Sequence, residues 1–243
     1  MVWRHVFDRR LEQNETIKIY YINIKVSIYI IQSDTMRILS NLFHFVSLTS
    51  KKYNIDESHG LSHSMNALYY ASQIYKYESV VNPHIIPQER LIYVSAVVHD
   101  MCDKKYVNQV EGVQEIQGFL QDKLTQFEVE STKKIISTMS YSTVKKNGFP
   151  ELGEIQDAYH IVREADLLTA YDFDRSMIYH INANNANLED AFTNAEELFV
   201  KRVLRHNKDK LFKTKYGILE SHKLHISAIN RMDYWKDMIN KIL

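Results

Sequence analysis

An apolar segment in the middle of the chain ends in a row of ionisable residues. The run at residues 91–98 leads without a break into the stretch HDMCDKK at residues 99–105. A carboxylate placed against an apolar core is costly unless a cation or a hydrogen-bond donor pairs with it. We therefore expect either a cationic side chain or a metal ion next to Asp100.

Two other segments carry side chains that could join this site. His59 and His63 lie four residues apart, on one face if both are helical. Asp166 lies beside a helical apolar stripe, and its structural alternative is an ion pair with Arg163 or Arg175. Imidazole and carboxylate ligands with positions open to water suit Mn²⁺, Fe²⁺, Co²⁺, Ni²⁺ or Mg²⁺ rather than a thiolate-held structural zinc. Such a cation would also offset the cost of burying the two carboxylates.

The composition excludes several classes of protein. Lys and Arg number 30, as do Asp and Glu, so the formal net charge is zero. This argues against general nucleic-acid binding, which depends on accumulated Lys and Arg. Cys102 is the only cysteine, so neither an intrachain disulfide nor a cysteine metal cluster can form, and a reducing, cytoplasmic setting fits best. We expect Cys102 to be a small buried residue rather than a nucleophile.

The residues of this site need helices to position them. With 6 glycines and 3 prolines in 243 residues, helix breakers are scarce, and the sequence predicts one all-α domain over residues 36–243. Apolar spacing places its helices at residues 36–53, 62–77, 87–98, 111–121, 127–140, 151–170, 188–210 and 220–242. Ser62 is the candidate N-cap of the second helix. The apolar stripe expected on that helix consists of Met65, Leu68, Tyr69 and Ile74.

Residues 1–35 are expected to form an N-terminal extension, either a strand or a disordered segment. The stretch at residues 17–32 is rich in β-branched and aromatic residues, as a strand would be. Lys18, Asn23 and Lys25 interrupt it, so it falls short of the roughly 20 apolar residues of a membrane span. We therefore expect no interaction with a membrane.

The order of the candidate ligands resembles a known family signature. His63 is followed by His99-Asp100 and then by Asp166, within the stretches SHGLSHSMNALYYA, SAVVHDMCDKKY and READLLTAYDFDR. These stretches resemble the motifs of the HD superfamily of metal-dependent phosphohydrolases, in its bacterial single-domain members. The tail LFKTKYGILESHKLHISAINRM is similar to the closing helices of that family. The resemblance covers residues 38–240 and implies an HD-domain helical bundle with a metal site at its centre.

The resemblance also implies which side chains would hold the metal. The ligands of one divalent ion would be His63, His99, Asp100 and Asp166. A water on that ion would be the nucleophile, because the cation lowers its pKa. His59 would face the mouth of the site and hold a phosphate oxygen or this water.

Further residues are implied for catalysis and for substrate binding. Lys105, and as a lesser candidate Lys104, would neutralise phosphate charge as the P–O bond breaks. Asp103 would act as a general acid or base, or would orient Lys105. Arg175 would also reach the phosphate. The partner is thus a small-molecule phosphate ester.

The chain departs from the family pattern at several positions. Asn66 stands where relatives often have an arginine. Members with two metal ions carry two further histidines between the HD pair and the last aspartate, whereas His160 is the only histidine in that interval here, which favours a single ion. Ser140 and Ser142 match positions that are often serine-rich near the site, although they could equally act as helix caps.

The main hypothesis is that the protein is a phosphohydrolase that acts on a small phosphate ester. Nucleotides are the first substrate class to consider. An HD-fold oxygenase with a diiron centre would need more histidines than residues 101–165 supply. The alternative, which is not an enzyme, is a non-catalytic, metal- or ligand-binding regulatory module. The presence of all four metal ligands speaks against it, because a binding module does not need the complete set. Histidines without a surrounding motif are expected at the surface or in packing: His5, His44, His84, His180, His206, His222 and His225.

Overall fold

The computed structural model of the chain describes residues 35–242. Within this range every regular element is a helix and none is a strand, which confirms the all-α prediction. The predicted extension falls outside the described residues except for its last position, and the possible strand at residues 17–32 falls wholly outside them. No helix of the described part is both long enough and apolar enough to cross a lipid bilayer.

The chain divides into two units, residues 1–41 and residues 42–243. Of the first unit the structure describes residues 35–41, which are helical. The second unit begins within a helix that ends at residue 53 and contains all the elements that follow. The fold and the site described below belong to this second unit.

The second unit consists of α-helices joined by short connections, four of which form 3₁₀ turns. The α-helices are α2 (Leu61–Val81), α3 (Glu89–Val98), α4 (Gln109–Leu120), α5 (Gln126–Thr138), α6 (Tyr141–Asn147), α7 (Gln156–Thr169), α8 (Phe173–Asn184), α9 (Leu188–Lys201) and α10 (Lys215–Ile242). The 3₁₀ turns are η1 (Pro83–Gln88), η2 (His99–Cys102), η3 (Gly153–Ile155) and η4 (Val203–Arg205).

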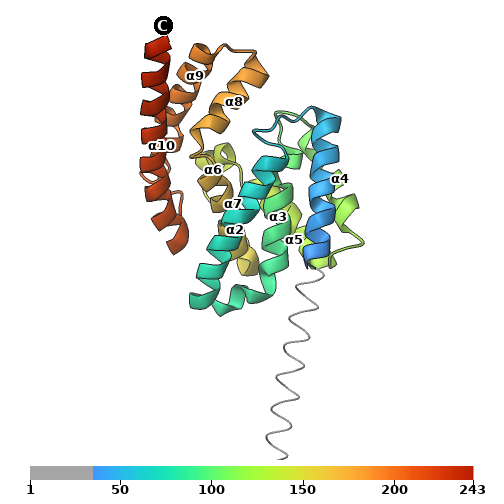
Figure 1. Cartoon of the computed structure of the whole chain (residues 1–243). Coiled ribbons are helices and arrows are strands. Elements are labelled where there is room, and N and C mark those ends of the chain that lie inside the picture. The colour runs from blue at the N-terminus through green and yellow to red at the C-terminus, as the bar shows by residue number, and fades with distance from the viewer. Residues whose placement is uncertain (1–34, 243) are drawn as a thin grey trace, which may run out of the picture. The chain divides into compact units, whose positions relative to one another are not determined.

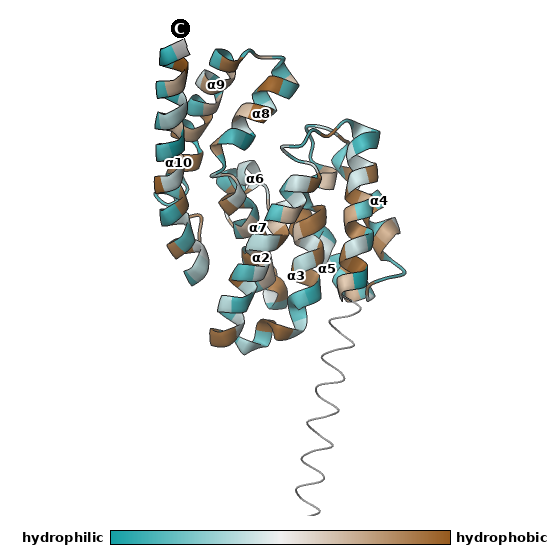
Figure 2. Ribbon diagram, in the orientation of Figure 1, coloured by the Kyte–Doolittle hydropathy of each residue, from teal (hydrophilic) through white to brown (hydrophobic). Residues whose placement is uncertain are grey.

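Helices α2, α3 and α7 lie side by side and form the centre of this unit (Figure 1). All residues of α3 from Leu91 to Val98 are buried, as expected for a helix that is apolar nearly all round. Brown, hydrophobic residues are accordingly visible along α3, whereas the surface of α10 is mostly teal and white (Figure 2). The end of α3 therefore delivers His99 and Asp100 from the core.

The buried face of α2 differs from the predicted stripe. Met65 and Tyr69 are 54% and 55% exposed, so the prediction that they face the core is wrong. The face turned inward carries mainly small and polar residues: His63, Ser64, Ala67, Ala71, Ile74, Tyr75 and Glu78. The small residues allow α2 to lie close to α7. Because this face, rather than the predicted stripe, is turned inward, His63 lies in the interior. The predicted cap Ser62 is also wrong, because α2 begins at Leu61 with Gly60 as its N-cap.

The C-terminal half contains helices that the apolar spacing did not predict. Helix α6 begins where the Ser140 hydroxyl accepts the backbone N–H of Thr143, and α8 begins where Asp172 accepts that of Arg175. The predicted helix at residues 188–210 is wrong beyond Lys201, where α9 ends and the short turn η4 follows. The predicted helix at residues 151–170 begins as the turn η3, and the last helix begins five residues earlier than predicted.

The start of α10 is held by a buried carboxylate of α7. Glu164 is fully buried and accepts hydrogen bonds from the backbone N–H of Lys213 at 2.6 Å and from the hydroxyl of Thr214 at 2.6 Å. Thr214 in turn accepts the backbone N–H of Gly217 at 2.9 Å. These bonds fix α10 to the helix that carries Asp166.

We expect Gly217→Ala to destabilise the fold although alanine is the better helix former. A Cβ atom at Gly217 would meet the Glu164 carboxylate and would lie 2.8 Å from the Thr214 hydroxyl. The loss in unfolding free energy should be about 1–3 kcal/mol, measured by urea unfolding. The control is Gly118→Ala in α4, where an added Cβ meets nothing within 4 Å and should stabilise by up to about 1 kcal/mol. Equal stabilisation of both variants would contradict this packing.

His206 should make the stability of the fold depend on pH. It is fully buried with no hydrogen-bond partner for either ring nitrogen among the described residues. Burial, together with the positive charges of Arg202 and Arg163, lowers its pKa to about 3, against a smaller opposing effect of Asp166. The unfolded chain therefore binds a proton below about pH 6.5 that the folded chain does not bind, and stability falls as the pH is lowered through this window.

The expected contribution of His206 is a loss of about 2 kcal/mol in unfolding free energy between pH 7 and pH 5. In His206→Phe this part of the pH dependence should disappear, as measured by urea unfolding at both pH values. His222→Phe, a change at an exposed position, should keep the slope of the unchanged protein. A His206→Phe variant with that same slope would mean that the imidazole is not buried as described.

Candidate functional site

Two imidazoles and two carboxylates converge where α2, the end of α3 and α7 meet. The Nε2 atoms of His63 and His99 are 3.1 Å apart. The Asp100 carboxylate places Oδ2 3.0 Å from Nε2 of His63 and Oδ1 3.3 Å from Nε2 of His99. Asp166 places Oδ1 3.4 Å from each Nε2 atom. The structure thus brings together all four of the predicted metal ligands.

The hydrogen bonds behind the imidazoles determine which nitrogen atoms face the cluster. Nδ1 of His99 is 2.8 Å from the carbonyl oxygen of Ala96, which can only accept, so Nδ1 carries the proton. The Thr169 hydroxyl donates to the carbonyl of Asp166 at 2.7 Å, so its oxygen is left to accept from Nδ1 of His63 at 3.3 Å. In the neutral form of each ring the Nε2 lone pair therefore points into the cluster.

The converging atoms fit a metal ion by their chemistry and by their spacing. Lone pairs of two nitrogen atoms and of two carboxylates face one another, and Asp100 Oδ2 is buried without a hydrogen bond of normal geometry. Ligands at about 2.1 Å from a shared cation lie roughly 3.0–3.4 Å from one another in octahedral or tetrahedral arrangements. His63, His99 and Asp166 form a group that could hold a metal ion, and Asp100 lies next to them.

The electrostatics of the cluster also favour a positive charge at its centre. Burial alone would lower the pKa of His99, but the carboxylates of Asp100 and Asp166 outweigh it and raise the pKa to about 9. Burial opposes ionisation of the two carboxyl groups, yet the histidines keep both pKa values well below the ordinary range. The surroundings therefore keep both carboxyl groups ionised, which favours a cation between them.

His59 lies in the turn before α2 rather than on its buried face. Its Nε2 is 3.1 Å from the ammonium of Lys105, which has only protons to give, so Nε2 accepts. Nδ1 then carries the proton and lies 2.7 Å from the Ser58 hydroxyl and 3.1 Å from the hydroxyl of Tyr106. Burial is the main cause that lowers the pKa of His59 to about 4, so the ring is neutral at pH 7.

The loop after the HD pair presents its lysines in two different ways. Lys105 is held by His59, and its backbone N–H donates to Oδ1 of Asp103 at 2.9 Å, while Oδ2 lies 4.0 Å from the ammonium. Lys104 also lines the cavity, but its side chain is exposed and makes no hydrogen bond with any residue in the described range. The surroundings distinguish the two lysines, whereas the sequence alone does not.

Arg175 lies at the cavity wall with part of its guanidinium already engaged. Its Nε donates to the backbone carbonyl of Ser58, and Nη1 donates to the Thr169 hydroxyl at 3.1 Å. Because Thr169 also contacts His63, Arg175 connects the turn of His59 to the back of the His/Asp cluster. The predicted contact with phosphate is then left to Nη2, which makes no hydrogen bond with any of the described residues.

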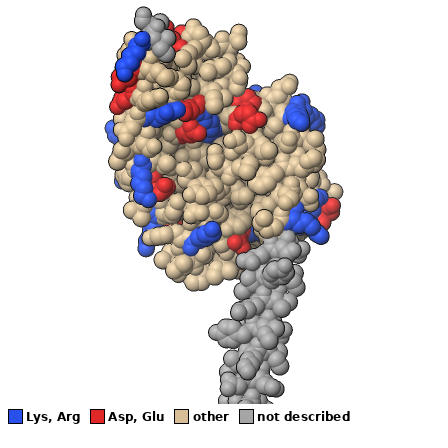
Figure 3. Space-filling view, viewed as in Figure 1, with Lys and Arg blue, Asp and Glu red and all other residues tan. Residues whose placement is uncertain are grey.

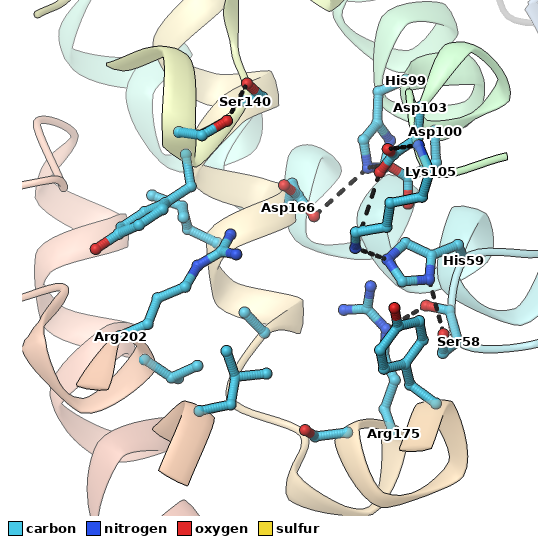
Figure 4. Close-up of a pocket in the computed structure, with 18 of the residues that line it drawn as sticks. Ser58, His59, His99, Asp100, Asp103, Lys105, Ser140, Asp166, Arg175 and Arg202 are labelled. Atoms are coloured by element: carbon cyan, nitrogen blue, oxygen red, sulfur yellow. Dashed lines mark hydrogen bonds and ion pairs between the residues drawn. The ribbon is translucent and has the colours of Figure 1, made fainter. Parts of the chain in front are cut away.

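A cavity of about 540 Å³ opens on one side of the cluster (Figure 4). His99, Asp100 and Asp166 form its floor, and Lys105 and His59 stand at one wall. The lining residues that were not predicted from the sequence include Tyr141, Tyr179 and Arg202. On the face of the molecule in Figure 3, basic and acidic side chains are interspersed rather than gathered into one patch.

No protein-family model matches the chain, and no curated protein matches its sequence. The structure is similar to a crystal structure of a Northeast Structural Genomics target from Lactobacillus plantarum, with a TM-score of 0.62. The two sequences are 16% identical, and the similarity covers 84% of this chain and 97% of the other. At this identity the comparison shows the fold alone. The chain is thus an all-α protein whose core presents a His/Asp group that could hold a metal ion.

Proposed function

We propose that the protein is a metal-dependent phosphohydrolase of the HD superfamily, which hydrolyses a phosphate ester of a small molecule. The observation that carries this proposal is the convergence of two Nε2 lone pairs and two carboxylates beside a cavity that also presents a lysine. A divalent cation with open positions is the ligand that such a donor set binds. An ammonium group next to it suits an anionic substrate. Nucleotides are the substrate class to test first.

His63, His99, Asp100 and Asp166 would hold one divalent ion, with Mn²⁺, Fe²⁺, Co²⁺, Ni²⁺ and Mg²⁺ as the candidates. When bound, the ion would activate a water as the nucleophile and polarise a phosphoryl oxygen. Ala96 and Thr169 keep the two imidazoles in the tautomer that leaves Nε2 free for this ion.

Lys105 would stabilise the negative charge that grows on the phosphoryl oxygens. One of its three N–H bonds is used by His59, which leaves two that can be donated into the cavity. His59 acts as a positioning residue, because its single lone pair is occupied by Lys105 rather than available to a water. Asp103 orients the same lysine through its backbone N–H. Preorganised donors of this kind lower the barrier because they need no reorientation during the reaction.

The test is phosphate release from a panel of nucleotides and sugar phosphates by purified protein. Samples would be compared as purified, after chelation, and after reloading with Mn²⁺. We expect release that chelation abolishes and reloading restores, with about one equivalent of metal per chain. Full metal occupancy with no release from any compound would favour a non-catalytic binding module instead.

A further inference from the structure

Arg202 faces the cavity from the break between α9 and η4. It is the last residue before η4, its backbone is no longer helical, and its neighbours Leu198, Phe199 and Val203 line the same cavity. In Figure 4 its side chain extends into the cavity from the wall opposite Lys105 and His59. The break thus redirects a side chain that a continuous helix would place elsewhere.

Among the described residues, no carboxylate is directly paired with the guanidinium of Arg202. Cζ lies 4.1 Å from the centre of the Tyr141 ring, and the side chain makes no hydrogen bond or ion pair with any residue in the range 35–242. Its surroundings remove it from water strongly enough that burial lowers its pKa, even though Asp166 acts in the opposite direction. A partly buried cation without a directly paired carboxylate reduces stability and is typical of binding sites.

The other arginines nearby do not share this situation. Arg175 is tied to Ser58 and Thr169. Arg205, three residues after Arg202, is exposed and lies 3.7 Å from Asp209. Arg202 therefore has N–H donors available towards the cavity. Arg175 has already used part of its own donors, and Arg205 turns its donors to solvent.

The neighbourhood of Arg202 suits a phosphate group. A guanidinium offers a planar fork of N–H donors that matches a phosphate in bidentate fashion. The hydroxyls of Ser140 and Ser142, which are 3.3 Å apart, line the same cavity and could donate to a further oxygen. The Tyr141 ring beneath the guanidinium keeps it in place.

We propose that Arg202 binds a second phosphate of the substrate, separate from the phosphate whose ester bond is hydrolysed at the His/Asp cluster. This rests on the proposed function and narrows its substrates to small molecules with two phosphates. Arg202 is then a specificity residue, and substrates with a single phosphate leave its charge uncompensated.

The experiment measures the binding of non-hydrolysable probes by calorimetry in excess Mg²⁺. Methylphosphonate has one anionic group, and methylene-, ethylene- and propylene-diphosphonate have two at increasing separation. At least one diphosphonate should bind about 10- to 100-fold more tightly than methylphosphonate. This gain in affinity is the one expected from one charge-assisted hydrogen-bonded pair. Arg202→Met should remove this advantage and leave methylphosphonate binding unchanged, whereas Arg205→Met should keep it.

Two binding results would overturn the proposal: no diphosphonate advantage in the unchanged protein, or an advantage that survives in Arg202→Met. A melting temperature of Arg202→Met at or above that of the unchanged protein is expected, because the substitution removes an uncompensated charge. A lower one would show a structural role instead. Phosphate release from the panel of nucleotides and sugar phosphates is assayed separately. Diphosphonate binding with no release from any compound of that panel would refute the proposed function and leave the Arg202 site standing.

Discussion

Asp166→Ala is expected to abolish metal binding and to reduce phosphate release by about 10³-fold or more. The carboxylate is a member of the group that could hold the ion, and its Oδ1 lies 3.4 Å from both Nε2 atoms. A catalytic metal contributes several kcal/mol of transition-state stabilisation, which corresponds to a rate factor of this order. Metal content by mass spectrometry and initial rates of phosphate release would be measured on the same preparation.

The matched control is Asp157→Ala, on the same helix. Asp157 is remote from the cluster and its carboxylate lies 2.6 Å from His84 at the surface. Its replacement should leave metal content and rate within about twofold, since exposed pairs contribute little. A metal-loaded, active Asp166→Ala variant would remove the carboxylate from the ligand set.

Lys105→Met should lower kcat by about 10²- to 10³-fold while metal binding is retained, because the ammonium is one preorganised donor to the developing charge. Methionine keeps much of the length of the side chain, so the loss reports the charge. Since His59 holds the ammonium, His59→Phe should show part of the same loss. The measurement is kcat for phosphate release at saturating Mn²⁺, together with metal stoichiometry.

Lys104→Met is the control for this prediction. Lys104 borders the same cavity, but its exposed side chain is not held in any one position by the described residues. We expect its replacement to change kcat by no more than about threefold, as for an exposed charge screened by water. If Lys104→Met were the more damaging of the two, the roles assigned to the lysines would have to be exchanged.

The core of the candidate site could be predicted from the sequence because its residues occur in short, ordered motifs. His99 and Asp100 follow a fully apolar run, and burial of that run places them inside the protein. His63 and Asp166 come from helices that pack against this run. The all-α class followed from few breakers and from apolar spacing. Membership of the HD superfamily and the hydrolytic reaction stay predictions.

The opposite wall of the cavity could not be predicted. Arg202 sits in a stretch whose apolar spacing continues past it, without glycine or proline to mark the end of α9. The helix nevertheless stops at Lys201, in a segment that packs against α8 and α10. From the sequence alone, a charged residue in such a stretch is predicted to lie on the solvent-exposed face of a helix. Only the fold shows that it lies beside a cavity.

The role of His59 also depended on contacts between distant segments. Its spacing from His63 suggested a shared helical face, but the helix begins only at Leu61. Tyr106, whose hydroxyl donates to Asp56 at 2.7 Å, and Lys105 approach the ring from a loop more than forty residues away in the chain. Pairings of this kind leave no periodic signal in the sequence, since they join two irregular segments.

The most direct test of the account is the anomalous diffraction of crystals soaked in Mn²⁺. We predict one strong peak per chain, at about 2.0–2.2 Å from Nε2 of His63, Nε2 of His99 and one oxygen each of Asp100 and Asp166. The remaining coordination positions should open towards the cavity that contains Lys105. A peak elsewhere, or none at this cluster at saturating Mn²⁺, would contradict the proposal that these four side chains form a metal site.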